Sequence, residues 1–339
     1  MTKGLLTFTG TIDLNQFWPE NMNGKSPYDS DADTVKVKVD MSSITFTSGT
    51  GKVKKTKALN NAGFWKNVKK SDGTKVKKFF PVINSNNIIT IRLQGIDAPE
   101  LHYDTGRPLY RQQMGETSTI ALYNFLKAQT TGSTIPCEVF TQVDTPNEVF
   151  DKYGRCVGDI NIKEKSVNTT DVNHWLIENG YAFPAFYNSM SFKEVKDIIA
   201  LSDKAQKAKS NIWKFISYQM EKMDRRLTHD KNVDDYSAAK DKKSPVIFPK
   251  LFRRLWALEI GEKKAFSFQA YNKFLESKKD DKVCRTSVFL KTGFPGKKPP
   301  ILASFVNVNG KINFEPAGIV FKEGGTTLRD DKNIKVTRF

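Results

Sequence analysis

Histidine and cysteine are scarce in this sequence, which contains three of each among 339 residues. The cysteines show no Cys-x-x-Cys spacing, so the sequence predicts neither a zinc site nor a disulfide framework. We expect them to be buried free thiols, as is usual in a reducing compartment. With so few histidines, an active site built on histidine is also disfavoured. The cysteines are Cys137, Cys156 and Cys284.

Long apolar runs are absent as well. No segment resembles a membrane span, and residues 1–10 lack the apolar core of a secretory signal peptide. We therefore expect a cytoplasmic protein with no membrane partner. With 38% hydrophobic and 12% aromatic residues, the chain can still bury a sizeable core. Its length suggests two domains or one elaborated domain.

Acidic residues are outnumbered, with 37 Asp and Glu against 54 Lys and Arg, and the net charge is +17. The excess is concentrated in two segments. Residues 52–78 contain ten lysines and one aspartate, and residues 240–339 contain twenty-two basic and ten acidic residues. These segments carry +9 and +12, which leaves about −4 for the rest of the chain. Basic additions to a body that is not basic predict a polyanionic partner.

Periodicity predicts strands and helices in the first two thirds of the chain. Alternating apolar and polar residues are typical of strands, and apolar residues three or four positions apart are typical of helices. In the helix that begins at Glu116, we expect Ile120, Ala121, Phe125 and Leu126 to form the apolar face. The predicted strands cover residues 4–12, 34–39, 88–94, 135–143 and 155–162, and the predicted helices cover 116–129, 172–178 and 192–209.

Composition divides the chain into three parts. We expect a first domain over residues 1–216, with a lysine-rich insertion at about 48–80 that extends the hairpin between two strands. A charged linker follows over 217–245, and a basic α+β module covers 246–339. Within this module, Asn309-Gly310 predicts a tight turn.

The segment Arg92-Leu-Gln-Gly-Ile-Asp-Ala-Pro-Glu100 predicts a strand that runs into an acidic turn. Arg92 lies on the polar side of the alternating strand, and Gly95 opens the turn that Pro99 stiffens. Asp97 and Glu100 lie on this turn. One cation and two carboxylates on a rigid corner can hold a metal, a water and a phosphate together, as phosphodiester hydrolysis requires.

Two weaker motifs accompany this corner. Asp31-Ala-Asp-Thr34 precedes the second strand, and Asp151-Lys-Tyr-Gly-Arg155 forms a turn between the last two strands. Taken alone, the aspartate pair is more typical of a turn cap than of a metal site. Arg155 alone is more typical of a solvated surface charge. Their occurrence in order around the corner favours a shared function.

In this order the motifs resemble those of the staphylococcal nuclease, or thermonuclease, family. The similarity covers about residues 4–214, interrupted by the insertion. It continues through residues 172–182 and 205–213, which look like the family's second helix and its closing helix. The resemblance implies an α+β protein with an OB-fold barrel of five strands and three helices. A smaller α+β C-terminal module follows here.

The resemblance also implies the residues of a site. The calcium-binding carboxylates of the family correspond to Asp33 and Asp97, and the backbone carbonyl of Ala98 corresponds to a further ligand. A carboxylate that orients water and two arginines that contact phosphate complete the set. The implied reaction cleaves the P–O5′ bond endonucleolytically and leaves a 3′-phosphate. The implied catalytic residues are Arg92, Glu100 and Arg155.

Candidate substrate-binding residues lie outside this set. Tyr153 matches a family position, whereas the aromatics of residues 181–187 are shifted, which leaves Tyr187 as a candidate for stacking on a base. In the insertion, aromatics among lysines are typical of a groove that follows single-stranded nucleic acid. A solvated hairpin that protects a sheet edge is the alternative. The insertion residues assigned to the substrate are Phe64, Trp65, Lys69 and Lys70.

The resulting hypothesis is a metal-dependent nuclease that uses Ca²⁺ and acts on DNA, RNA or both. The alternative is a non-catalytic nucleic-acid-binding or scaffold protein on the same fold, whose C-terminal module binds another protein. In that module, Arg253-Arg254 is interpreted as the solvated edge of a helix and is assigned no chemistry.

Overall fold

The computed structural model describes most of the chain, in segments separated by gaps. The described residues are 4–16, 31–48, 55–58, 68–71, 76–80, 86–101, 103, 109–143, 149–151, 155–163, 169–220, 228–229, 245–263, 265–322 and 328–329.

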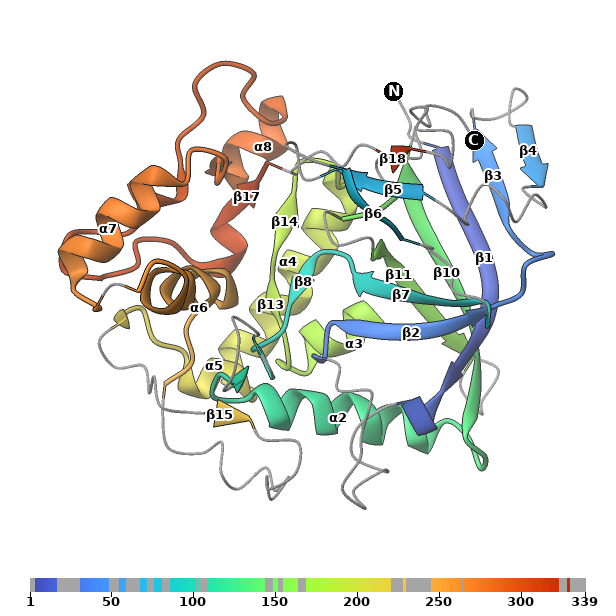
Figure 1. Ribbon diagram of the computed structural model, residues 1–339. Helices are drawn as coiled ribbons and strands as arrows, with labels where there is room; N and C mark the ends of the chain where they lie inside the picture. The colour runs from blue at the N-terminus through green and yellow to red at the C-terminus, as the bar shows by residue number, and fades with distance from the viewer. Residues whose placement is uncertain are drawn as a thin grey trace.

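A closed β-barrel forms the first part of the structure (Figure 1). Its strands follow the ring order β1–β2–β7–β11–β10, and β10 pairs with β1 to close it. All neighbours are antiparallel except β7 and β11, which are parallel. This ring confirms the predicted OB-type barrel. The strands are β1 (Gly4–Asp13), β2 (Thr34–Val39), β7 (Ile88–Leu93), β10 (Thr134–Val143) and β11 (Cys156–Lys163).

The barrel forms because its strands alternate apolar and polar side chains. In β7, Ile89, Ile91 and Leu93 are buried, while Thr90 and Arg92 are half-buried on the other side. This alternation buries one row of branched side chains inside the ring and leaves the second row for solvent or for a site. Arg92 therefore lies on the polar side of β7, as predicted.

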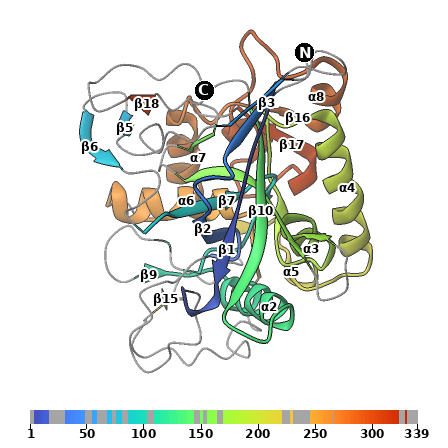
Figure 2. The same ribbon diagram turned by 90° about the vertical axis from the view of Figure 1, so that its right-hand side faces the viewer.

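In the described part of the chain, helices α2 to α5 lie beside the barrel (Figure 2). The N-cap carboxylate of Asp171 accepts from the amide of His174 at 2.9 Å, and the N-cap hydroxyl of Ser191 accepts from the amide of Glu194 at 3.2 Å. Both caps satisfy amides that would otherwise lack partners. The helices are α2 (Gly115–Ala128), α3 (Val172–Glu178), α4 (Phe192–Lys207) and α5 (Ile212–Phe215).

The predicted apolar face of α2 is confirmed in part. Leu126 is buried, and Phe125 packs half-buried against the barrel core, where it stacks on Trp175 with ring centroids 4.1 Å apart. Leu122 and Tyr123, which the prediction omitted, are buried as well, whereas Ile120 and Ala121 are only half-buried. Because residues 120–123 are apolar without interruption, periodicity does not single out one face there.

The insertion lies between β2 and β7, which pair with each other, as predicted. Its first hairpin extends the barrel sheet outward, because β3 pairs with β1 and β4 pairs with β3. Its second hairpin forms a separate sheet, in which β5 pairs with β18 from the end of the chain. These strands are β3 (Thr45–Ser48), β4 (Lys55–Ala58), β5 (Val68–Ser71), β6 (Val76–Phe80) and β18 (Leu328–Arg329).

Several short strands form pairs outside the ring of the barrel. β8 pairs with β13, β9 pairs with β15, and β12 pairs with β11. A 3₁₀ turn, η1, follows β1 directly. The bounds are η1 (Leu14–Gln16), β8 (Ile96–Asp97), β9 (Leu109–Tyr110), β12 (Thr169–Asp171), β13 (Phe183–Pro184), β14 (Phe186–Tyr187) and β15 (Thr228–His229).

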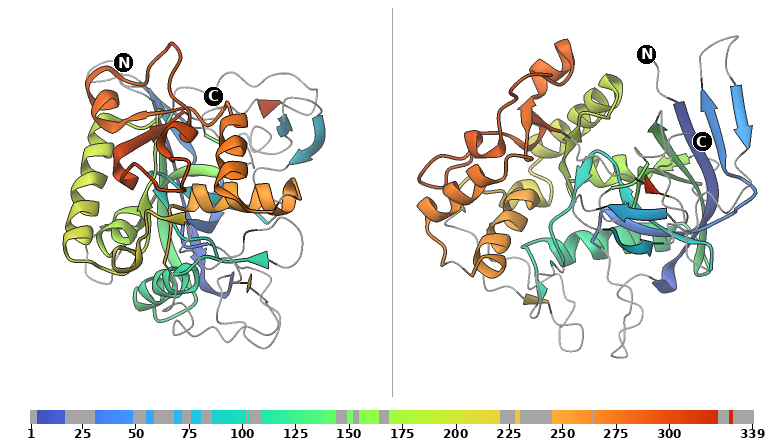
Figure 3. Two further views of the ribbon diagram at one scale, coloured as in Figure 1. Left: turned by 90° about the vertical axis from the view of Figure 1, so that its left-hand side faces the viewer. Right: turned by 45° about the horizontal axis from the view of Figure 1, so that its top comes forward.

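The C-terminal region is an additional α+β unit beside the barrel, on the side where β8 and β13 lie (Figure 1). Its helices α6 and α7 lie far from β1 and β3 (Figure 3). A three-stranded sheet, β14–β17–β16, takes one strand from the earlier part of the chain. The elements are α6 (Pro249–Trp256), η6 (Ala257–Gly261), α7 (Phe268–Ser277), β16 (Val283–Arg285), α8 (Thr286–Thr292), η7 (Leu302–Phe305), η8 (Pro316–Gly318) and β17 (Ile319–Phe321).

Two hydrophobic cores hold these parts together. The first fills the barrel, and the second combines residues of the C-terminal region with residues of the preceding part. Phe183 packs edge-on against Phe248 at 6.1 Å, and Tyr110 stacks on Trp256 at 3.8 Å. The second core therefore crosses the predicted linker, and the division at residues 216 and 246 stays a prediction.

Several smaller predictions can be compared with the structure. All three cysteines are buried and free, as expected. The turn at Asn309-Gly310 is also confirmed, since Gly310 has φ 74° and its amide donates to the Asn307 carbonyl at 3.0 Å. In the described part of the chain, no helix has the length and apolar character to cross a membrane.

Asn173 links α3 to the strand ends that carry the acidic corner. Its amide nitrogen donates to the Gln94 carbonyl at 2.9 Å and to the Asp159 carboxylate at 2.8 Å. Because the side chain is fully buried, we expect Asn173→Ala to lower the free energy of unfolding by about 3 kcal/mol. Chemical denaturation measures this change. Asn179→Ala, at a half-buried cap, is the control and should cost less than about 1 kcal/mol; equal losses would contradict the assigned role.

Candidate functional site

The acidic corner begins at Gly95, where β7 ends. Gly95 adopts φ +75°, and a Cβ at this position would lie 2.5 Å from Cδ1 of Ile198 and 2.8 Å from Cε of Met190. Its carbonyl accepts from the amide of Ala185 at 2.8 Å. Glycine is therefore required both for the turn and for close packing under it. The backbone that leads to Asp97 is therefore fixed by its packing against Ile198 and Met190 and by the hydrogen bond from Ala185.

Arg92 brings the two predicted metal carboxylates together. Its guanidinium contacts Oδ1 of Asp33 through Nη1 and Oδ1 of Asp97 through Nη2, the latter at 2.5 Å. The pairing of β2 with β7 accounts for this, because Thr34 lies opposite Arg92 in the register. The second carboxylate oxygen of Asp33 accepts from the amide of Ala98 at 2.8 Å. Both carboxylates are buried and oriented toward one point.

Glu100 lies beside this pair in a buried position. Its backbone is fixed by Gln112, whose side-chain oxygen accepts from the Glu100 amide at 3.1 Å and whose own amide donates to the Glu100 carbonyl at 2.8 Å. Asp31 fixes the next residue, accepting from the Leu101 amide at 2.7 Å. Burial, together with the neighbouring carboxylates of Asp31, Asp97 and Asp33, raises the pKa of Glu100 to about 8, although Arg253 opposes this shift.

Arg155 is connected to the carboxylates through Thr34. Its Nε donates to Asp151 at 2.7 Å, which fixes the side chain within its own turn. Its Nη1 lies 3.3 Å from the Thr34 hydroxyl, and that hydroxyl donates to Oδ1 of Asp33 at 3.1 Å. The side chain is 28% exposed. Arg155 therefore borders the cluster with a side chain that remains partly accessible to solvent.

A third arginine, which the sequence did not predict, comes from the C-terminal region. Arg253 on α6 binds Asp97 with both terminal nitrogens, at 3.1 and 2.8 Å, and its Nη1 also contacts Glu100. Burial alone would raise the pKa of Asp97, but Arg253 and Arg92 outweigh it and hold that pKa below its usual value. The sequence indicated only that residue 253 lies at the edge of the apolar stripe of α6, and it did not indicate what that edge contacts.

The adjacent Arg254 belongs to a separate ion cluster. Its Nε and Nη2 bind the carboxylate of Asp281 at 2.5 and 2.6 Å. Lys250 lies 3.4 Å from the same carboxylate and 4.4 Å from the centroid of the Phe321 ring. Burial lowers the pKa of Lys250 to about 8, although Asp281 opposes this shift. The two arginines of the pair thus have different partners, one in the acidic corner and one within the C-terminal region.

Only some of the predicted substrate-binding residues fall within the described part of the chain, and one of them, Tyr187, interacts electrostatically with Arg253. Tyr187 lies on β14 and packs against Phe321, with ring centroids 6.0 Å apart. Lys69 and Lys70 lie on β5, opposite Arg329 and Leu328. The remaining residues of this group lie outside the described part of the chain; they are Phe64, Trp65 and Tyr153.

The residues of the corner fit a hard divalent cation in their chemistry. Asp33 and Asp97 offer only oxygen ligands, which such cations prefer, and their contacts with Arg92 show that they converge. Arginine nitrogens nevertheless occupy these oxygens in the present arrangement. Among the residues that the structure describes, no three His, Cys, Asp or Glu side chains are arranged to hold a metal.

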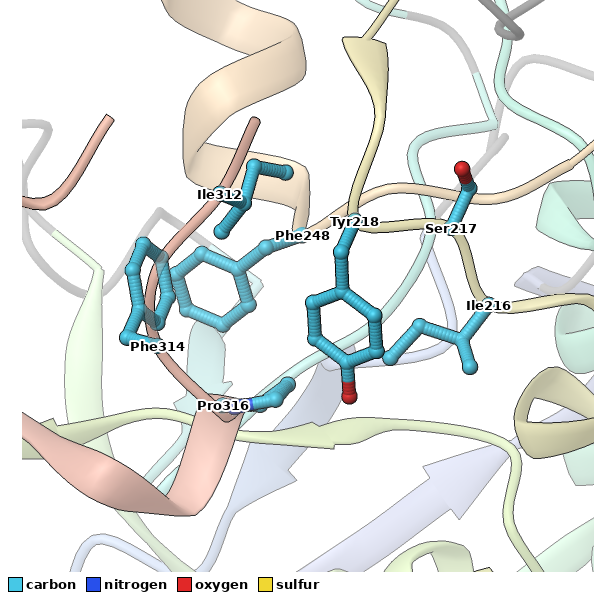
Figure 4. Close-up of a pocket in the computed structure, with 7 residues that line it drawn as sticks. All are labelled: Ile216, Ser217, Tyr218, Phe248, Ile312, Phe314 and Pro316. Carbon is cyan, nitrogen blue, oxygen red and sulfur yellow. The ribbon is translucent and has the colours of Figure 1, made fainter. Parts of the chain in front are cut away.

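A small pocket elsewhere is apolar and distinct in character from the corner (Figure 4). It lies where the segment after α5 meets the C-terminal region, and the Tyr218 hydroxyl contacts Glu315 nearby. Its lining offers no charged group for a phosphate. The lining residues are Ile216, Ser217, Tyr218, Phe248, Ile312, Phe314 and Pro316.

Gly95→Ala tests whether this turn positions the corner. We expect a loss of about 2 kcal/mol or more in the free energy of unfolding, from the positive φ and from the clash with Met190 and Ile198. Thermal or chemical denaturation measures it. Gly293→Ala, at φ +77° with nothing within 4 Å, isolates the backbone strain and should cost about 1 kcal/mol. Gly296→Ala, in open space, should have almost no effect; equal losses at all three positions would refute the packing argument.

Comparison with known proteins agrees with the fold and with the motifs. Residues 90–215 match the family model described as staphylococcal nuclease homologue. No curated protein matches the chain. The matched residues include Arg92, Asp97, Glu100 and Arg155, whereas Asp33 precedes the match and joins the site through the pairing of β2 with β7. The resemblance is therefore confirmed over residues 90–215, and this part of the chain is a staphylococcal-nuclease-like region.

Proposed function

We propose that the protein is a metal-dependent nuclease that hydrolyses phosphodiester bonds of DNA, RNA or both. One observation carries this proposal. Five residues from three separate motifs meet at one end of the barrel. Arg92 contacts Asp33 and Asp97 directly, Thr34 links Arg155 to Asp33, and Arg253 links Glu100 to Asp97. The five residues are Asp33, Arg92, Asp97, Glu100 and Arg155.

The metal in this proposal is Ca²⁺ or another hard divalent cation. Asp33 and Asp97 would hold it, with the Ala98 carbonyl as a further oxygen ligand. Bound there, the cation would neutralise a non-bridging phosphate oxygen and help to position the attacking water. The buried, oxygen-only donor pair supports this assignment.

Glu100 is the proposed general base. Its carboxylate lies next to Asp97 in a site that excludes most solvent, and a base with a pKa near the working pH is effective in proton transfer. It would take the proton from the water that attacks phosphorus. In the proposed outcome the P–O5′ bond breaks, and a 3′-phosphate remains.

Arg92 and Arg155 are the proposed phosphate ligands. A guanidinium presents a planar fork that matches two phosphate oxygens, and it stabilises the negative charge that grows on them during the reaction. Arg155 is suited to this role, because Asp151 fixes its Nε while the side chain remains 28% exposed.

The polyanion itself is the proposed partner of the basic segments. The insertion and the C-terminal region carry the net positive charge of the chain, which attracts phosphate backbones and makes binding depend on salt. Lys69, Lys70, Phe64 and Trp65 are proposed contacts in the insertion. Tyr153 and Tyr187 are proposed to stack on bases.

Glu100→Gln tests the enzymatic part of the proposal. We expect cleavage of single-stranded and duplex DNA and RNA to fall by about 10²–10⁴-fold, because the variant cannot accept the proton from water. Adding a chelator to the wild-type protein should abolish cleavage. Glu178→Gln, an exposed residue paired with Lys204, is the matched control and should cleave normally. Cleavage that resists both the chelator and the Glu100 substitution would refute this mechanism.

A non-catalytic nucleic-acid-binding or scaffold protein is the second candidate. The contacts of Arg253 with Asp97 and Glu100 favour it, because they occupy groups that catalysis needs. The same experiment distinguishes the two functions. Metal-independent binding without any cleavage by the wild-type protein would support the second.

The double substitution Lys69→Gln with Lys70→Gln tests the insertion. We expect the slope of log affinity against log salt for single-stranded DNA to become shallower by about 1.4, since each phosphate contact on a single strand contributes about 0.7. Fluorescence anisotropy over a salt series measures it. Lys193→Gln with Lys204→Gln, on the exposed side of α4, is the control. An unchanged slope would contradict phosphate binding by these lysines and would favour the alternative of a solvated hairpin that protects a sheet edge.

A further inference from the structure

Arg253 binds the two carboxylates on which the proposed metal chemistry depends. Its two terminal nitrogens engage both oxygens of Asp97, and one of them also contacts Glu100. Arg92 contacts one of the same oxygens, Oδ1 of Asp97. Two-pronged contacts between arginine and a carboxylate are among the strong charge-assisted hydrogen bonds. A cation that binds Asp97 must therefore displace at least part of the Arg253 contact.

The backbone of Arg253 is held firmly beside the site. In α6, its neighbours Leu251, Phe252 and Leu255 are fully buried. The hydroxyl of Tyr271 donates to the Leu251 carbonyl at 3.0 Å, and the side chain of Gln112 donates to the Ile247 carbonyl at 3.0 Å. Because the helix is anchored in the second core, rotation of the Arg253 side chain is enough to release the carboxylates, and α6 need not unpack.

The charge of Arg253 makes it an alternative to a cation in the corner. Asp33, Asp97 and Glu100 are buried there, and Arg253 contacts the carboxylates of Asp97 and Glu100. Its positive charge therefore neutralises part of the negative charge that would otherwise attract the metal.

We propose that Arg253 is a built-in competitor of the catalytic cation, which binds Asp97 and Glu100 in the metal-free protein and raises the metal concentration that the site requires. This inference rests on the proposed function, because it takes Asp97 as a metal ligand. It adds a residue from outside the nuclease-like region, with a defined effect on metal affinity. The coupling is reciprocal, so metal binding weakens the hold of Arg253 on the corner.

Calorimetric titration of the metal-free full chain with Ca²⁺ alone tests the proposal. We expect Arg253→Gln to lower the Kd for Ca²⁺ by about 10-fold, within the range of about 5–150-fold that is typical of coupled sites. Arg253→Lys should lie between wild type and Arg253→Gln, because a lysine keeps the charge but cannot engage both oxygens. Arg254→Gln is the matched control, since Arg254 binds Asp281 instead, and it should leave the Kd within about 2-fold of wild type.

The outcomes separate this proposal from the proposed function. An unchanged or weaker affinity in Arg253→Gln, with metal-dependent cleavage intact in the wild type, would overturn the competitor and leave the nuclease standing. If neither the wild type nor Arg253→Gln binds Ca²⁺, the competitor role of Arg253 is overturned as well. Cleavage without any metal would overturn both this role and the proposed metal-dependent nuclease. Thermal unfolding of each variant verifies its fold. If Arg253→Gln does not fold, the comparison of Arg253→Lys with wild type decides, and equal affinities would refute the proposal.

Discussion

Mutual repulsion of carboxylates is the constraint around which this structure is organised. Asp31, Asp33, Asp97 and Glu100 gather where β2 begins and β7 ends, and all but the half-buried Asp31 are shielded from solvent. Buried like charges are unfavourable unless opposite charges or hydrogen bonds compensate them. Backbone amides, Arg92 and Arg253 supply that compensation. Much of the surrounding fold serves to bring these donors to the same point.

The barrel and most of the corner could be predicted because they depend on local patterns. Alternation fixed the face of Arg92, and the antiparallel neighbours β2 and β7 then placed Thr34 opposite it. The face of α2 could be predicted only in part, because residues 120–123 are apolar without interruption and periodicity does not show which of them meet the barrel. The side chains assigned to the insertion lie beyond what the structure describes, and their roles stay predictions.

Arg253 could not be predicted for a different reason. It lies more than 150 residues from its partners in the sequence, and nothing in its neighbourhood resembles a binding motif. Its position follows from the second core, where α6 packs against residues that precede the predicted linker. Contacts of this kind depend on the packing of whole elements. Periodicity shows that one edge of α6 is polar, but it does not show what that edge meets.

The pairing of β14 with β17 has a consequence for how the protein is made. Phe186 lies opposite Val320 in this parallel pair, so the sheet cannot close until 134 further residues have been synthesised. At about 5–20 residues per second, that delay is roughly 7–27 s. During synthesis the barrel strands are complete while most of the second core, which comes from residues 246–321, is still missing. The nascent chain therefore passes through a stage in which its acidic corner lacks Arg253 and the apolar surface beside it lacks the C-terminal residues of the second core.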